Sequence, residues 1–164
     1  MGDVGYRREG PLAVITLQRP VVLNALTLAM IGDIRRFALE AERDPAVTAI
    51  CITGEGRGFC AGIDMSVLVA HTRGEAPSGD ADPDANPALF SFLLDISKPV
   101  IAALNGVAAG GGFVLAMMCD LRFMSDTAAL TTVFSRRGLI AEHGTSWLLP
   151  RIVGLSRALD LLWS

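Results

Sequence analysis

The sequence predicts an α/β fold in which parallel strands alternate with helices. Two observations lead to this class: apolar segments of strand length recur along the chain, and segments with helical features lie between them. The strands are expected at residues 47–53, 100–104 and 121–124. Segments this short and this apolar are typical of strands buried on both faces of a parallel sheet. Strands that alternate with helices give the β-α-β pattern of the α/β class.

Before these strands, the chain is expected to form a β-hairpin and a long helix. Residues 4–9 and 12–17 alternate or run apolar on either side of a Gly-Pro pair, which predicts two strands joined by a tight turn. Apolar side chains then recur every three or four residues with charged ones between them, which predicts an amphipathic helix. Its apolar positions are Leu28, Ile31, Ile34, Phe37, Ala38 and Ala41, and Pro45 lies past its end.

Two stretches of bare backbone, residues 59–64 and 105–112, follow predicted strands. The second contains three consecutive glycines and leads into residues 113–118, which are expected to be helical. The free N–H groups at the start of a helix carry partial positive charge, and glycine lets a ligand approach the backbone closely. The two stretches therefore predict a site built from backbone amides.

Residues 71–87 differ from the rest of the chain, because they hold three prolines, two glycines and four acidic residues, with alanine as their only apolar residue. Such a segment buries too little apolar surface to offset the entropy of ordering, so we expect a disordered surface loop. Its place after the first glycine stretch leaves an ordered lid open as the alternative. The remaining helices are expected at residues 88–96, at residues 145–152 and from about Ser156.

Composition limits the classes of function. The 164 residues are 51% apolar and 19% charged, which suits one soluble domain over residues 1–164. The net charge of −3, without a basic stripe, argues against a nucleic-acid partner. No apolar run reaches the length of a membrane span, and the N-terminus has no apolar signal core. Three cysteines in apolar surroundings suit reduced thiols, so we expect a cytoplasmic protein.

Several common sites are excluded or weakly supported. A phosphate-binding P-loop needs a Gly-Lys pair, and the sequence has none. Residues 56–61 match the dinucleotide pattern G-x-G-x-x-A after a buried strand, but residues 71–87 stand where its second strand and acidic residue are required. A serine nucleophile elbow is absent, and the histidines and cysteines lack the spacings of zinc ligands, so no metal is expected.

The glycine stretches carry a specific resemblance. Residues 59–65, 98–106 and 110–120, with the earlier motifs Arg19-Pro20 and 23–26, closely resemble the enoyl-CoA hydratase/isomerase (crotonase) superfamily, in family order from Val14 to Leu162. The resemblance implies a crotonase-like spiral of repeated ββα units that binds acyl-CoA thioesters. It implies coenzyme A as the acyl carrier without a further cofactor, and assembly as a homotrimer or a dimer of trimers.

The resemblance also implies a C-terminal helical segment that follows the helix near Ser156 and helps to cover the acyl-CoA site. The sequence ends at Ser164, within that helix. We therefore expect the C-terminal helical part to be truncated, with an uncovered apolar face that includes Leu159, Leu161, Leu162 and Trp163. A genuine minimal form is the alternative.

In members of the superfamily, two backbone N–H groups bind the thioester carbonyl oxygen. Carried onto this chain, these donors are the amides of Ile63 and Gly111. Removing a proton beside a thioester creates an enolate oxyanion, which fixed N–H donors stabilise. The alternative is two ordinary strand-to-helix turns. Residues of the same motifs are expected to contact the substrate, and these are Leu23, Ala61, Gly62, Asp64, Gly110, Val114 and Phe134; Asp64 is also expected to begin a helix.

The acid–base group must decide the reaction. Hydratases of the superfamily carry two glutamates where this chain has Val114 and Phe134, and neither side chain can move a proton. Glu142 resembles in position the acidic catalyst of several isomerases, and Leu139, Ile140, Ala141 and Trp147 are expected to desolvate it. The alternative for Glu142 is a charge at the start of helix 145–152. The adjacent His143 points elsewhere on most local backbones, so it is expected to be a supporting or surface residue.

These observations predict an acyl-CoA isomerase in which the Ile63 and Gly111 amides hold the thioester oxygen and Glu142 moves a proton between carbons. Two alternatives stay open. One is hydration by an atypical water-positioning group, and the other is a protein that binds acyl-CoA without turning it over.

Overall fold

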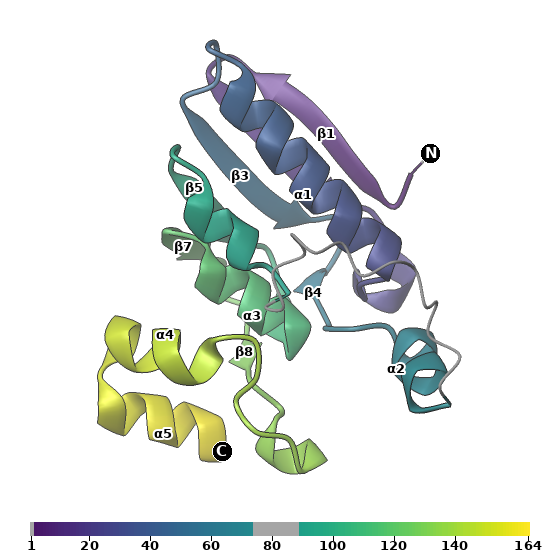
Figure 1. The fold of residues 1–164 in the computed structure, drawn as a ribbon, viewed down its shortest axis with the longest axis vertical. Coiled ribbons are helices and arrows are strands. Elements are labelled where there is room, and N and C mark those ends of the chain that lie inside the picture. The colour runs from purple at the N-terminus through teal and green to yellow at the C-terminus, as the bar shows by residue number, and fades with distance from the viewer. Residues whose placement is uncertain (1, 74–88) are drawn as a thin grey trace.

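The computed structural model describes residues 2–73 and 89–164, which form two β-sheets with helices around them (Figure 1). The larger sheet has the strand order β1-β2-β3-β5-β7, in which β1 and β2 are antiparallel and the other neighbours are parallel. Its strands are β1 (Val4–Glu9), β2 (Leu12–Leu17), β3 (Ala49–Gly54), β5 (Val100–Leu104) and β7 (Leu121–Met124). The smaller sheet is parallel, in the order β4 (Gly58–Cys60), β6 (Val107–Ala109) and β8 (Leu130–Thr131).

The strands and helices follow one another as repeated ββα units. Each unit sends one strand to the larger sheet and the next to the smaller sheet, and then forms a helix. The units are β3-β4-α2, with α2 at Met65–Thr72, then β5-β6-α3, with α3 at Gly111–Met118, and β7-β8 followed by the short 3-10 helix η3 (Ser135–Arg137). This arrangement confirms the α/β class and the spiral of ββα units.

Most predicted elements are present at their expected positions. The hairpin strands, β5 and β7 have the predicted bounds, and the long amphipathic helix is α1 (Leu28–Arg43), which begins at a Thr27 cap. The predicted strand 47–53 is displaced, because the amide of Val47 closes a turn onto the carbonyl of Asp44, 3.0 Å away. The strand therefore begins at Ala49, after that turn.

The expected helix at residues 88–96 is replaced by a shorter 3-10 helix, η2 (Ser91–Asp95). Leu93 within it and the flanking cap residues Phe90 and Ile96 are buried and recur every three residues, which is the period of a 3-10 helix. Residues 74–87 of the expected loop at 71–87 lie outside the described residues. His71 and Thr72 belong to α2, so the loop prediction is wrong at its first two positions.

Helix α3 is the central helix of the core. Its residues from Gly112 to Met118 are all buried, as expected for a helix that is apolar on every side. Helix α4 (Thr145–Val153) and helix α5 (Leu155–Trp163) lie side by side near it at the C-terminal end of the chain (Figure 1). Leu161 and Leu162 pack partly against the core, so the expected exposed face of α5 is reduced there, while Trp163 remains exposed.

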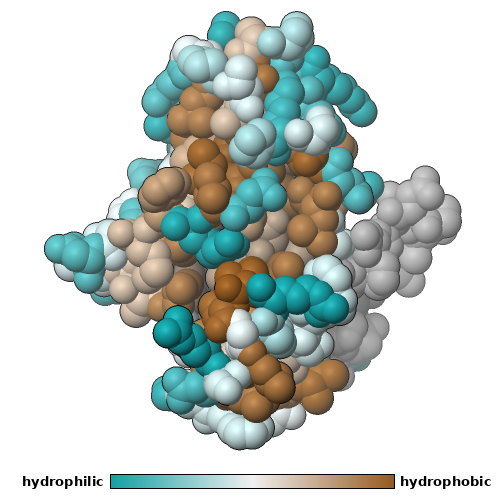
Figure 2. All heavy atoms as spheres, turned by 90° about the vertical axis from the view of Figure 1, so that its left-hand side faces the viewer, coloured by the Kyte–Doolittle hydropathy of each residue, from teal (hydrophilic) through white to brown (hydrophobic). Residues whose placement is uncertain are grey.

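The last strand of the larger sheet, β7, carries exposed apolar side chains, namely Leu121, Phe123 and Met124. Figure 2 shows the side of the molecule that includes this strand, with apolar groups interspersed among polar ones. In the described part of the chain, no helix is long and apolar enough to cross a membrane.

Candidate active site

A cavity of about 380 Å³ lies at the carboxyl ends of the strands of the smaller sheet. Residues that follow β4, β6 and β8 form most of its wall, and the segment before α4 closes it. The lining residues are Ala61, Gly62, Ile63, Met65, Gly110, Gly111, Val133, Phe134, Arg137, Leu139, Glu142 and His143. Since the carboxyl ends of parallel strands meet at one edge of a sheet, this is where an α/β protein is expected to bind a ligand.

The first turn leaves the amide of Ile63 free. Ile63 forms an isolated parallel bridge with Leu26, in which the Leu26 amide donates to Gly62 O (2.8 Å) and the Asp64 amide donates to Leu26 O (2.9 Å). Because these flanking groups make the bonds of the bridge, the N–H of Ile63 points away from Leu26. Among residues 2–73 and 89–164 it meets no acceptor. The first turn therefore offers one N–H donor on the side of the cavity.

The second turn leaves the amide of Gly111 free. Gly111 is the first residue of α3, and the amide of Val114 makes the first helical bond, to Gly110 O, at 2.9 Å. An N–H at the first helical position has no partner within the helix. Among residues 2–73 and 89–164 the Gly111 amide meets no acceptor. A methyl group on Gly111 would lie 3.4 Å from the nitrogen of Ile63, so the two free amides are neighbours.

Two other glycines are required for this approach. Gly62 has a φ of +107°, which residues with a side chain rarely adopt. A methyl group on Gly62 would also lie 3.0 Å from Ala109 O. A methyl group on Gly112 would collide with the backbone carbonyl of Cys60. The bare backbone of the glycine stretches thus lets the two turns pack against each other.

The segment with the Arg19-Pro20 and 23–26 motifs is hydrogen-bonded to the strand and turn of residues 55–61, which precede Ile63. Asn24 is fully buried, and its side-chain amide donates to Glu55 O (3.0 Å) and Gly58 O (2.8 Å). Its Oδ1 accepts from the Arg19 amide at 2.9 Å. Leu23 accepts from the Ala61 amide at 2.9 Å and does not line the cavity. Leu23 therefore holds the first turn through its backbone.

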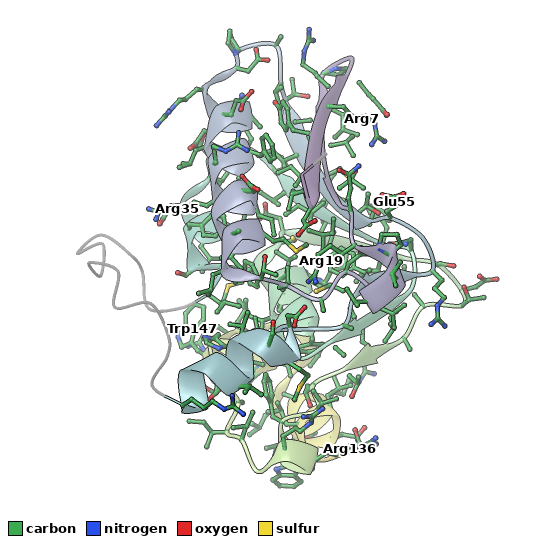
Figure 3. The ribbon with its side chains drawn as sticks, turned by 90° about the vertical axis from the view of Figure 1, so that its right-hand side faces the viewer. Arg7, Arg19, Arg35, Glu55, Arg136 and Trp147 are labelled. Atoms are coloured by element: carbon green, nitrogen blue, oxygen red, sulfur yellow. The ribbon has the colours of Figure 1, made fainter. Side chains whose placement is uncertain are left out.

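Asp64 also lies outside the cavity lining, because its carboxylate is occupied by other groups. Its Oδ1 accepts from the amide and the hydroxyl of Ser66 at the start of α2, as expected of a residue that begins a helix. Its Oδ2 accepts from Arg19 Nη1 at 2.8 Å. Figure 3 shows Arg19 in the interior between α1 and α2. The bonds from Ser66 and then the Arg19 guanidinium lower the pKa of Asp64 to about 2.

Asp64 should therefore make the protein sensitive to acid. Its pKa is lower in the folded chain than in the unfolded one, so its stabilising effect is present near neutral pH and is lost as the pH falls toward about 2. We expect Asp64→Asn to be less stable than the unaltered protein at pH 6, with a difference that shrinks steadily toward pH 2. Urea unfolding at several pH values measures this difference. A difference that stays constant with pH would contradict the role of the carboxylate charge.

The positions where hydratases of the superfamily carry glutamates are apolar and buried here. Val114 lies within α3 and does not reach the cavity lining, whereas Phe134 is part of the lining. The cavity wall therefore receives no carboxylate from either position. Of the site residues predicted from the sequence, the structure brings seven together around the cavity: Ala61, Gly62, Ile63, Gly110, Gly111, Phe134 and Glu142.

Glu142 reaches the cavity from the segment before α4. The cap residue of α4 is Gly144, so Glu142 lies just before the helix and is not its cap, and the alternative role of its charge at the helix start stays open. Three of the four apolar neighbours expected to desolvate Glu142 are themselves exposed: Leu139 at 48%, Ile140 at 80% and Trp147 at 56%. The Trp147 ring packs under the Arg151 guanidinium, 3.9 Å from the ring centre. The Glu142 side chain itself is 40% exposed.

Sequence reasoning missed four residues of the lining, which are Met65, Val133, Arg137 and His143, whereas Leu139 was already expected beside Glu142. His143 was expected to point elsewhere, yet its Nε2 lies 3.8 Å from Glu142 Oε2. Arg137 follows β8 through η3, and the signal that could have located it is its place after the third strand of the smaller sheet. The cavity lining therefore includes two polar side chains, Arg137 and His143, that the motifs alone did not indicate.

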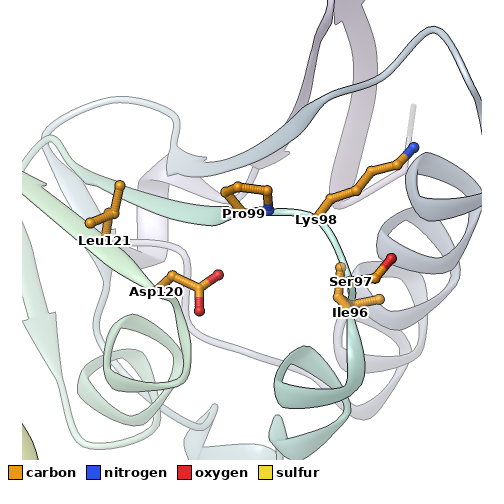
Figure 4. A pocket seen from close by; sticks show the side chains of 6 residues that line it. All are labelled: Ile96, Ser97, Lys98, Pro99, Asp120 and Leu121. Atoms are coloured by element: carbon orange, nitrogen blue, oxygen red, sulfur yellow. The ribbon is translucent and has the colours of Figure 1, made fainter.

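A second cavity, of about 410 Å³, lies at the amino ends of β5 and β7 (Figure 4). Its charged residues already have backbone partners. Lys98 points toward α1, where its Nζ donates to Ala41 O and Asp44 O, and Asp120 accepts from the Val100 amide at 2.8 Å. Asp120, directly before β7, thus joins the start of that strand to the start of β5. In the described ranges, no group of three or more His, Cys, Asp or Glu side chains could hold a metal ion.

Comparison with known proteins adds the family. A sequence model of the enoyl-CoA hydratase/isomerase family matches residues 7–163. The chain belongs to this family. It is 38% identical over 155 residues to the 1,2-epoxyphenylacetyl-CoA isomerase of Escherichia coli, covering 93% of this chain and 59% of the relative. It is 36% identical over 162 residues to the enoyl-CoA hydratase ACTT3 of Alternaria alternata, covering 94% of this chain and 53% of the relative.

Solved structures of the family share the fold. An enoyl-CoA hydratase from Polaromonas sp. JS666 superposes with a TM-score of 0.84 at 34% identity, covering 99% of this chain and 63% of that structure. The crotonase-like fold implied by the resemblance is thereby confirmed. The chain spans between half and two thirds of the length of these relatives.

Proposed function

We propose that this family member is an acyl-CoA isomerase. The amides of Ile63 and Gly111 bind the thioester oxygen, and Glu142 moves the proton that shifts the double bond. One observation carries the proposal: Ile63, Gly111 and Glu142 line a single cavity, and the amides of the first two meet no acceptor in the described part of the chain, while the positions of the hydratase glutamates hold Val114 and Phe134. One carboxylate suffices for isomerisation, because the group that removes the proton also returns it.

The chemistry follows from these positions. Glu142 removes a proton from C2 of a 3-enoyl thioester, and the negative charge spreads onto the thioester oxygen as a dienolate. Two fixed N–H donors stabilise this oxyanion, and one such donor is worth about 3–4 kcal/mol in the transition state. Glu142 then returns the proton to C4, so the double bond moves to C2 with no net change in atoms or charge.

The names of relatives support both an isomerase and a hydratase. The Escherichia coli relative is named an isomerase of an acyl-CoA, and the Alternaria relative is named an enoyl-CoA hydratase. Hydration is therefore the second candidate, with a polar group of the cavity positioning the water in place of the two glutamates. Binding of acyl-CoA without turnover is the third possibility that an experiment must separate.

A panel of 2-enoyl and 3-enoyl thioesters of coenzyme A tests the proposal. We expect the protein to convert 3-enoyl into 2-enoyl thioesters and to add water to 2-enoyl thioesters much more slowly, as followed by chromatography of the products. Fast hydration would favour the second candidate. Tight binding measured by calorimetry, with no conversion of any thioester, would show a binding protein and contradict the isomerase.

We further propose that the chain uses coenzyme A only as the acyl carrier of its substrate, acts in the cytoplasm, and assembles as a homotrimer or a dimer of trimers. The free thiols of Cys51, Cys60 and Cys119 support a reducing compartment. Family membership supports the assembly, which sedimentation analysis measures directly.

A further inference from the structure

Two adjacent residues, Glu142 and His143, both line the cavity. The backbone between them explains this. The amide of Thr145 donates to Glu142 O at 2.9 Å, and the two residues between them, His143 and Gly144, have φ of +52° and +78°. Two successive left-handed residues closed by such a bond form a type I′ turn. The turn rotates His143 onto the same side as Glu142.

The turn holds His143 in a conformation that is uncommon for a residue with a side chain. Glycine and asparagine are preferred at both central positions of a type I′ turn, and a residue held in a sparsely populated conformation costs about 1–3 kcal/mol. Such strain is concentrated at functional sites, where the surrounding structure enforces it. Gly144 satisfies the preference of the turn, but His143 does not. The strained residue is the one whose side chain lines the cavity.

The side chains of the turn are poised to interact. His143 Nε2 lies 3.8 Å from Glu142 Oε2, and the two side chains are 30% and 40% exposed. This separation is slightly longer than a hydrogen bond, and hydrogen bonds of catalytic groups often tighten only when the substrate is bound. Arg137 lines the same cavity but forms no ion pair with Glu142 within 4 Å in the described part of the chain. Among the described residues, the imidazole of His143 is therefore the basic group that pairs with the carboxylate.

We propose that His143 is a positioning residue for Glu142. Its Nε2–H donates to Oε2 when an acyl-CoA is bound, which stops rotation of the carboxylate and leaves Oε1 facing the reacting carbons. This inference rests on the proposed isomerase function and adds to it a residue that acts through Glu142. A base that must reach two carbons of one substrate gains from a fixed orientation, because a misplacement of about 1 Å can lower a rate about 100-fold.

Two substitutions separate this role from the turn itself. Asparagine accepts left-handed backbone well, so His143→Asn keeps the turn, but its short side chain cannot reach Glu142. Glutamine places an N–H at about the reach of Nε2. We expect His143→Asn to lower kcat for isomerisation about 10- to 100-fold with KM changed less than about 3-fold. We expect His143→Gln to recover part of the lost kcat.

Several kinetic results would overturn the proposal. They are a kcat for His143→Asn equal to that of the unaltered protein, a change confined to KM, or equal losses in the asparagine and glutamine variants. If the asparagine variant unfolds, His143→Gly takes its place, because glycine suits the turn and also lacks the donor. If the glutamine variant unfolds, the kcat of the asparagine and glycine variants decides. The glycine variant is expected to show the same loss of kcat as the asparagine variant.

A measurement without turnover keeps this inference distinct from the isomerase proposal. With a saturated acyl-CoA bound, ¹H–¹⁵N spectra should show an imidazole N–H of His143 that exchanges slowly with water. The signal should be lost in Glu142→Ala, which removes the acceptor. If the signal is absent, or persists unchanged in Glu142→Ala, the positioning role is wrong whether or not the protein isomerises any thioester. A protein with the signal but no activity would instead contradict the isomerase.

Discussion

Replacing Glu142 by glutamine should lower kcat for double-bond isomerisation about 1,000-fold. The glutamine amide has nearly the same size and shape as the carboxylate, but it cannot accept a proton at neutral pH. Proton transfer by a positioned side chain contributes about 100- to 10,000-fold to a rate. The Ile63 and Gly111 amides do not depend on Glu142, since they belong to turns after β4 and β6. We therefore expect the affinity for a saturated acyl-CoA to change little.

The control for this prediction is Glu55→Gln. Glu55 is an exposed acid at the end of β3, away from the cavity lining, and Figure 3 shows it near the surface. Its substitution changes the net charge by the same amount as Glu142→Gln, and we expect it to leave kcat unaltered. Stopped-flow or steady-state kinetics with a 3-enoyl thioester measures both variants. Full activity in Glu142→Gln would show that another group is the base.

Replacing Gly111 by proline should lower kcat about 100- to 1,000-fold, because the oxyanion loses one of its hydrogen-bond donors. Proline has no N–H, so it removes one of the two proposed donors, and loss of one such donor costs a rate of this size. Gly111 is the first residue of α3, a position where proline is well tolerated, because the N–H there has no helical partner. The substitution therefore tests the donor while it preserves the helix.

The matched control is Gly111→Ala, which keeps the N–H. Its methyl group would lie 3.1 Å from Ile63 Cδ1, the end of a flexible side chain that can move aside. We expect the alanine variant to retain kcat within about 10-fold, with the proline variant far below it. Circular dichroism and thermal unfolding establish that both variants are folded. Equal kcat in the two variants would mean that the Gly111 amide does not hold the thioester oxygen.

The larger elements of the fold could be predicted from the sequence because their patterns are local. Strands β5 and β7 are short apolar runs, and α1 carries its apolar residues at helical spacing. Strands β4, β6 and β8 have three residues or fewer, and such strands exist because neighbouring strands pair with them, which a local pattern does not record. The same reason explains η2, where burial of every third side chain overrides the helix expected from composition.

The residues of the candidate site likewise fall into those that the sequence predicts and those that it does not. Glycines in a strand-to-helix context indicate free amides, so Ile63 and Gly111 were predictable from the motifs and from the family that they resemble. The position of His143 was not, because a left-handed backbone at histidine has no sequence signal apart from the glycine that follows. The exposure of Ile140 and Trp147 was equally hidden, since apolar composition does not say which side chains a fold covers.

The complete burial of helix α3 limits which parts of the site can change by substitution. Its first residue supplies one proposed donor, and the rest of the helix is buried on every side, so that donor can move only if the core itself opens. The opposite wall, from Arg137 to His143, belongs to a partly exposed segment with few core contacts. Substitutions that alter substrate preference should therefore accumulate on the wall before α4. The wall at α3 is held constant by the requirement that the protein fold.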